Sequence, residues 1–255
     1  MHWRLLLSPP RSAAANMAID EALMDRTART GEAVLRVYAW EAPSLSLGRH
    51  QAARDTYSPT RAQELGVQVV RRPTGGRALL HWREVTYSVV APVTIGELRE
   101  SYARINRLLL DGLGRLGVRA ELARPAGRSP LPGDAPCFEV PVEGELVLDG
   151  RKLVGSAQWR DRGALLQHGS ILVDDDQPML ARLATRPIPP APPAATLREA
   201  LGRAPSTSEV ADALFAAVRT LEDGGASPLA DEGALDDAAR ERSMQYEDDR
   251  WTWRR

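Results

Sequence analysis

The segment 145–173 reads ELVLDGRKLVGSAQWRDRGALLQHGSILV, and its pattern decides the fold class. Three β-rich runs, at residues 145–148, 152–159 and 164–173, are separated by the turn signals Asp149-Gly150 and Asp161-Arg162-Gly163. An Asp-Gly pair between two β-rich runs favours a hairpin. We therefore predict three successive strands joined by tight turns.

Helical and β-rich patterns are mixed over the rest of the chain. We expect helices at 12–29, 60–65, 96–116, 196–201, 207–221 and 231–243, and strands at 34–40, 44–47, 67–70 and 85–90. The proline- and glycine-rich residues 125–136 predict a mobile loop, and residues 186–193 a stiff extended connector. Hairpins within such a mixture favour an α/β (α+β) fold with a mixed, largely antiparallel sheet flanked by helices.

Composition narrows the class of protein. A net charge of −1 gives no basic field for bulk attraction to nucleic acid or membrane. The chain has no apolar run of about 20 residues that would span a bilayer, and the apolar part of residues 1–10 is too short for a signal peptide. A single cysteine excludes an intrachain disulfide and a cysteine zinc site. We expect a soluble cytoplasmic protein, without metal, whose thiol stays reduced.

One lysine, Lys152, stands among 33 basic residues that are otherwise all arginine. A guanidinium keeps its proton in a protein, whereas the amine of a lysine can be tuned by burial and neighbours to act as a base. Arginine bias across a whole proteome would also leave a single lysine by chance. The pattern alone leaves both interpretations open.

The only cysteine, Cys137, lies fifteen residues before Lys152. A lone cysteine is usually a small buried apolar residue, but a thiolate beside a base or cation is a nucleophile. His81, His168 and Lys152 are the candidate partners for this thiol.

Two glycine-containing segments carry candidate binding residues. In residues 71–81, RRPTGGRALLH, paired glycines after a strand allow a ligand to approach the backbone, and the flanking arginines and His81 could bind it. In residues 167–170, QHGS, the glycine marks either a bulge or a close approach beside His168. The run Asp174-Asp175-Asp176 is more typical of helix caps than of a metal site.

Taken together and in order, these motifs resemble the biotin/lipoate protein ligase (BPL/LPL) catalytic-domain superfamily, in particular octanoyl-acyl-carrier-protein:protein octanoyltransferases of the LipM type. The resemblance runs over most of the chain. The segments that carry it are 16–23, 44–51, 71–78, 86–88, 137–139, 150–158, 166–170 and 246–254, together with His81.

The resemblance implies a single catalytic domain over 1–255, with 187–255 a mainly helical C-terminal part, and a fold like that of class II aminoacyl-tRNA and biotin synthetases. It implies that Cys137 takes an octanoyl group from octanoyl-acyl carrier protein as a thioester, while Lys152 lowers the pKa of the thiol and serves as base. A lysine of a lipoyl-accepting domain, such as glycine cleavage H protein or dehydrogenase E2, then receives the group. The substrate-binding positions implied are Arg72, Gly75, Gly76, Arg77, His81, Gly155, Ser156, Ala157, His168 and Gly169.

Two alternatives stay open at this point. An ATP-dependent lipoate–protein ligase shares the glycine segment and the lysine, and would require ATP and Mg; Cys137 and Arg77 favour the transferase, as does the expected lack of a ligase C-terminal domain. A non-catalytic lipoyl- or octanoyl-binding protein would not need both Cys137 and Lys152. For the transferase we expect no cofactor and a monomer.

Overall fold

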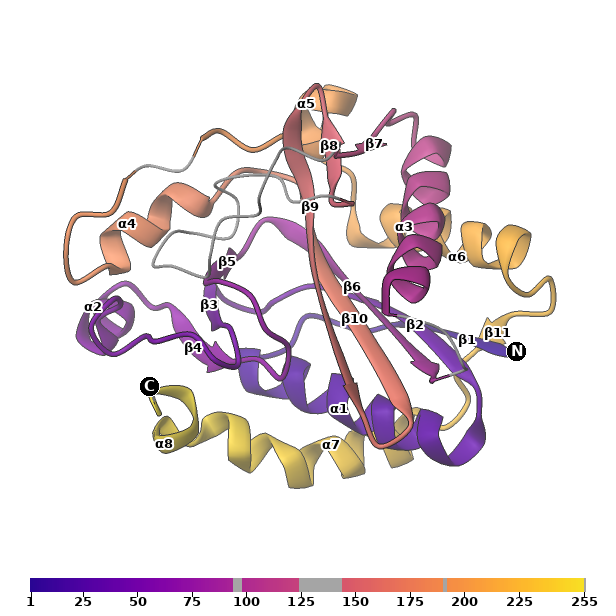
Figure 1. Ribbon diagram of the computed structural model, residues 1–255, viewed down its shortest axis with the longest axis horizontal. Coiled ribbons are helices and arrows are strands. Elements are labelled where there is room, and N and C mark those ends of the chain that lie inside the picture. Colours follow the sequence, from indigo (N-terminus) through magenta and orange to yellow (C-terminus); the bar gives the residue numbers. More distant parts are fainter. Residues whose placement is uncertain (94–97, 124–143, 190–191, 255) are drawn as a thin grey trace.

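The strands predicted at 145–173 lie within an eight-stranded mixed sheet of order β11-β1-β2-β6-β10-β9-β8-β7 (Figure 1). This computed structural model describes residues 1–93, 98–123, 144–189 and 192–254. The sheet strands are β1 (Trp3–Leu7), β2 (Ala33–Tyr38), β6 (Glu84–Pro92), β7 (Glu121–Leu122), β8 (Leu146–Leu148), β9 (Arg151–Asp161), β10 (Ala164–Leu172) and β11 (Ser227–Pro228). Among the strands described for this sheet, the β11–β1 and β1–β2 pairs are parallel and the other five pairs are antiparallel, so the predicted largely antiparallel sheet is confirmed.

Both predicted tight turns are present. Asp149 and Gly150 have φ values of 50° and 73° between β8 and β9, and Arg162 and Gly163 have φ values of 47° and 82° between β9 and β10. Two consecutive positive φ angles match the right-handed twist of the flanking strands. The resulting β9–β10 hairpin is the longest in the sheet and crosses the centre of the molecule (Figure 1).

Helices cover both faces of this sheet (Figure 1). The helices are α1 (Ala13–Thr30), α2 (Pro59–Glu64), α3 (Leu98–Arg115), α4 (Leu180–Leu183), α5 (Leu197–Leu201), α6 (Thr207–Leu221), α7 (Glu232–Glu247) and α8 (Asp249–Thr252), with a short 3₁₀ turn at Gln177–Met179. Strand alternation divides β2 between the two faces: Leu35 packs in the core with α3 and α6, and Tyr38 packs in the core with α1 and α7.

A second sheet, of order β4-β3-β5, lies beside the large one and has its own apolar core under α2 and α4. Its strands are β3 (Ser44–Leu47), β4 (Gln68–Arg71) and β5 (Leu79–His81). The glycine-containing segment predicted after β4 therefore connects two strands of this small sheet. It faces the β9–β10 hairpin of the large sheet.

Four short strands, β1, β5, β7 and β11, are not predicted by the sequence pattern. The apolar run in β1 is weighed there only as a targeting signal, and β5 falls in the segment 71–81, which is interpreted only as a binding segment. The predicted loop at 125–136 and Cys137 lie outside the described residues. Among the helices that the structure describes, none is both long and apolar enough to cross a membrane.

Candidate functional site

A pocket of about 450 Å³, its open mouth included, lies between the small sheet, α1 and the β9–β10 hairpin. Its lining consists of Met17, Tyr38, Trp40, Ser46, Arg72, Gly76, Leu79, His81, Thr86, Gly155, Ser156, Ala157, His168 and Gly169.

Most of the candidate binding residues meet at this pocket. Arg72, Gly76, His81, Gly155, Ser156, Ala157, His168 and Gly169 all line it, whereas Gly75 and Arg77 do not. Met17, Tyr38 and Trp40 were not expected there. They come from α1 and the end of β2, and their apolar surface closes one side of the pocket.

Gly169 is explained by a close approach of two strands. A Cβ atom built on Gly169 would lie 2.4 Å from the carbonyl oxygen of Gly155 and 2.9 Å from Cε1 of Tyr87. Gly169 pairs in unbroken register with both neighbouring strands, so it marks no bulge. The absence of a side chain here therefore lets β10 pack closely against its neighbouring strands at this wall of the pocket.

The loop of residues 72–77, here called the glycine loop, is held from inside by Arg72. Nη2 of Arg72 donates to the carbonyl oxygens of Gly75 and Arg77 at 2.7 and 2.8 Å. Nη1 donates to the carbonyl and hydroxyl oxygens of Ser46, and Nε to Gly75 and to the hydroxyl of Thr74. The guanidinium carries five N–H donors, and protein oxygens accept from all three of its nitrogens.

The glycine loop also packs closely on the end of β3. A Cβ on Gly48 would lie 1.9 Å from the carbonyl oxygen of Gly76, and Gly76 itself has a φ of 96°. Both glycines are therefore required for this contact.

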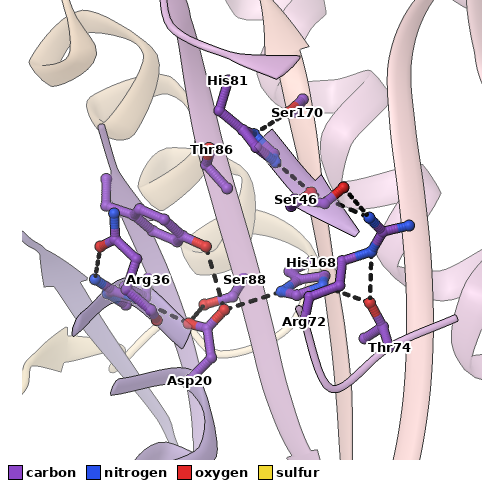
Figure 2. Close-up of polar contacts among 12 residues, drawn as sticks. Asp20, Arg36, Ser46, Arg72, Thr74, His81, Thr86, Ser88, His168 and Ser170 are labelled. Carbon is purple, nitrogen blue, oxygen red and sulfur yellow. Dashed lines mark hydrogen bonds and ion pairs between the residues drawn. The ribbon is translucent and has the colours of Figure 1, made fainter. Parts of the chain in front are cut away.

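A buried ionic cluster beneath the pocket centres on Asp20 of α1, which is 0% exposed (Figure 2). Its carboxylate accepts from Arg36 at 2.9 Å, Ser88 at 2.8 Å, Tyr38 at 3.2 Å and Nδ1 of His168 at 3.0 Å. Burial alone would raise the pKa of Asp20, but the hydrogen bond from His168 and the charge of Arg36 outweigh it and lower the pKa. Burial lowers the pKa of His168, so its imidazole is neutral near pH 7.

A second carboxylate–imidazole pair lies on the other side of the pocket. Nδ1 of His81 is 2.7 Å from Glu84, whose carboxylate also accepts from Thr86 and Ser170 at 2.6 Å. The His81 ring stacks on Trp40 with 4.1 Å between ring centroids. Both histidines of the pocket are thus held in fixed orientations.

Lys152 lies on β9, three residues before Gly155, which corresponds to about 10 Å along a strand. Its Nζ donates to the Glu145 carboxylate at 2.7 Å, and the two side chains are 2% and 9% exposed. A buried ammonium needs such a counter-charge. Sequence reasoning missed Glu145, although the Asp149-Gly150 hairpin brings it back toward Lys152.

The three aspartates after β10 have structural partners. Asp174 pairs with Arg198, Asp176 pairs with Arg83, and Asp175 accepts from the backbone N–H groups of Gln177 and Ala194. The three aspartates therefore connect neighbouring loops through hydrogen bonds and ion pairs.

The fold and the pocket define a class of protein. A crystal structure of lipoate-protein ligase A bound with ATP superposes with a TM-score of 0.80 at 23% identity, covering 99% of each chain. The sequence also matches the family "Lipoyl protein ligase A/B catalytic domain" over residues 12–219. The chain belongs to this family, as the motifs predicted.

Curated relatives show which enzymes of this family the chain resembles. An octanoyltransferase LipM from Kyrpidia tusciae is 50% identical over 184 residues, which cover 68% of this chain and 67% of the relative. An octanoyltransferase LipM from Symbiobacterium thermophilum is 42% identical over 235 residues, 84% of each chain. The predicted resemblance to LipM-type octanoyltransferases is confirmed.

Proposed function

We propose that this protein transfers an octanoyl group from octanoyl-acyl carrier protein to the thiol of Cys137, and then to a lysine of a lipoyl-accepting domain. The observation that carries the proposal is the 42–50% identity to octanoyltransferases over at least two thirds of the chain. The pocket adds physical support, because it presents an apolar side to a fatty chain.

In the first step the Cys137 thiolate attacks the thioester carbonyl of the donor. A new carbon–sulfur bond forms, and the bond to the carrier's sulfur breaks as that thiolate leaves. One thioester replaces another, so no ATP is needed and no cofactor enters. In the second step the neutral acceptor amine attacks the thioester carbonyl and a carbon–nitrogen bond forms. The carbon–sulfur bond to Cys137 breaks as its thiolate leaves, and the proton released by the amine passes to that thiolate or to water.

The octanoyl chain occupies the pocket between the glycine loop and the β9–β10 hairpin. Met17, Trp40 and Leu79 supply the apolar surface, at about 0.8 kcal/mol for each methylene buried. Gly155, Ala157 and Gly169 are small enough to leave room for the chain beside the strands.

Lys152 acts as a fixed cation that favours the Cys137 thiolate. Its ion pair with Glu145 supports this role over that of a free base, because the carboxylate stabilises the ammonium. Arginine would keep the charge but could not reproduce the compact three-donor ammonium in the same buried space.

The partners follow from the chemistry: an octanoyl-loaded acyl carrier protein as donor, and the H protein of glycine cleavage or a dehydrogenase E2 lipoyl domain as acceptor. Incubation of the protein with octanoyl-carrier protein and an apo lipoyl domain, without ATP, tests the whole sequence. Mass spectrometry of the domain is expected to show one octanoyl group on its lysine.

An ATP-dependent ligase would use a different acyl donor. It would modify the domain from free lipoate, ATP and Mg without any carrier protein. Modification under those conditions alone would overturn the transferase proposal. Tight octanoate binding without covalent transfer under either condition would instead favour the non-catalytic binding protein.

A further inference from the structure

Two carboxylate–imidazole–hydroxyl chains converge on one arginine beneath the glycine loop. Figure 2 shows the first chain and, of the second, the part from His81 through Ser46 to Arg72. In the first, Asp20 contacts Nδ1 of His168 at 3.0 Å, and Nε2 of His168 contacts the Thr74 hydroxyl at 2.7 Å. The hydroxyl of Thr74 accepts from Nε of Arg72 at 3.2 Å. The first chain therefore runs from α1 through β10 to the loop.

The second chain has the same chemical order. Glu84 contacts Nδ1 of His81 at 2.7 Å, and Nε2 of His81 contacts the Ser46 hydroxyl at 2.8 Å. That hydroxyl accepts from Nη1 of Arg72 at 3.0 Å. Two nitrogens of one guanidinium are thus each held by a hydroxyl that a histidine orients.

Donor chemistry fixes the direction of both chains. A guanidinium can only donate, so Thr74 and Ser46 each accept from Arg72; a carboxylate can only accept, so Nδ1 of each histidine donates to its carboxylate. In a neutral imidazole with its proton on Nδ1, Nε2 is the acceptor, and the Thr74 or Ser46 hydroxyl donates to it. Replacing either carboxylate removes what keeps the proton on Nδ1.

The geometry resembles an acid–histidine–hydroxyl triad, but the hydroxyls are not placed for attack. Thr74 and Ser46 are both 0% exposed, and each hydroxyl is occupied on both sides. What they hold is Arg72, which in turn binds the carbonyl oxygens of Gly75 and Arg77. The chains therefore act on the shape of the loop.

We propose that Asp20 and Glu84 are positioning residues that fix the glycine loop of the pocket through these two chains and Arg72. The kinetic readout of this inference rests on the proposed acyl transfer; its structural readout does not. Misplacing a binding element by about 1 Å costs up to about a hundredfold in rate.

Thr74→Val is the direct test, since it keeps the shape and removes the hydroxyl, and Thr74→Ser restores the hydroxyl. We expect hydrogen exchange of the loop amides at 75–77 to accelerate about tenfold or more in Thr74→Val, and Cys137 octanoylation to slow by a similar factor. Thr74→Ser is expected to stay within about threefold of wild type. The exposed Thr60 of α2 provides a matched control, Thr60→Val, with no expected change.

Glu84→Gln perturbs the second chain, and it is the alternative test variant if Thr74→Val does not fold. Among the described residues Glu84 has no arginine partner, so the substitution strands no buried cation. We expect Glu84→Gln to accelerate loop exchange and to slow Cys137 octanoylation, as Thr74→Val does. In the double variant the fold-change should be smaller than the product of the two single fold-changes, because either substitution alone releases Arg72.

Unchanged loop exchange in folded Thr74→Val and Glu84→Gln would overturn the proposal. So would a combined effect equal to the product, or a loss in Thr74→Ser equal to that in Thr74→Val. If wild type formed no octanoyl thioester, the proposed function would fail, while the exchange comparison would still decide the role of the two chains.

Discussion

At the scale of single residues, the proposed acyl transfer depends on Lys152 and its carboxylate partner, Glu145. Lys152→Arg keeps the positive charge but places a larger, planar group in a site that is 2% exposed. We expect octanoylation of Cys137 to fall by about a hundredfold or more, measured as the rate of adduct formation. Full activity of Lys152→Arg would remove the proposed role of the amine.

Glu145→Gln probes the same pair from the other side. Removing the carboxylate leaves a buried ammonium without that counter-charge, at a cost of about 2 kcal/mol or more in the free energy of unfolding. The double variant Glu145→Gln, Lys152→Met is expected to recover stability but not activity. Denaturant unfolding and adduct formation, measured side by side, separate these effects; recovery of activity in the double variant would contradict the account.

The sequence predicts some of these residues and not others. Lys152 and His168 are visible because each is a reactive side chain in a distinctive segment. Asp20 and Glu145 are ordinary acids in the sequence, and only the fold shows that both are buried beside a cation. For Asp20 the available signal was an acid among the apolar positions of a predicted helix.

At the scale of elements, the β9–β10 hairpin sets the wall of the pocket. Gly169→Ala would place a methyl group 2.4 Å from the Gly155 carbonyl oxygen, so the strands must separate. We expect a loss of about 1–3 kcal/mol in the free energy of unfolding and a reduced rate of acyl transfer.

Gly114→Ala in α3 is the matched control for this substitution. An added Cβ there meets nothing within 4 Å, and Ala is the better helix former by about 1 kcal/mol. We expect it to be neutral or stabilising by chemical denaturation. A Gly169→Ala protein as stable as Gly114→Ala would show that the strand contact imposes no constraint.

The elements differ in how far local sequence determines them. The hairpins around Asp149-Gly150 and Arg162-Gly163 follow from turn chemistry, and α1 follows from its Ser12 cap and apolar spacing. Strands β1 and β5 are short and gain their partners from distant segments, β2 and β3. Their pairing therefore could not be read from local pattern alone.

At the scale of the whole molecule, charge pairing predicts acid sensitivity. Hydrogen bonds from Arg4 lower the pKa of Glu32 to about 2, from an ordinary value of 4.5, with Arg26 contributing as well. The unfolded chain therefore binds a proton at Glu32 first as pH falls. Stability from this pair is complete above pH 4.5 and is lost toward pH 2.

Glu32→Gln tests this linkage. We expect it to reduce the free energy of unfolding by about 1 kcal/mol at pH 7, because the site is partly solvated. The difference in free energy of unfolding between wild type and Glu32→Gln should become smaller as the pH falls from 4.5 toward 2. Urea unfolding at each pH measures this difference. A difference that is constant with pH would contradict the assignment.

The C-terminal part, 187–255, is proposed to fold with the rest as one domain. Its helix α6 packs in the core with β2 and α3, and α7 packs in the core with α1. We expect coincident unfolding transitions by tryptophan fluorescence and circular dichroism. Two separated transitions would indicate an independent C-terminal unit.

The most direct test of the central claim is the intact mass of the protein after incubation with octanoyl-carrier protein and no ATP. We expect the addition of one octanoyl group, which peptide mapping locates on Cys137. This adduct should be absent in Cys137→Ser and should be lost from the wild-type protein when an apo lipoyl domain is added. Octanoyl transfer to the lipoyl domain at the wild-type rate by Cys137→Ser would contradict the central claim.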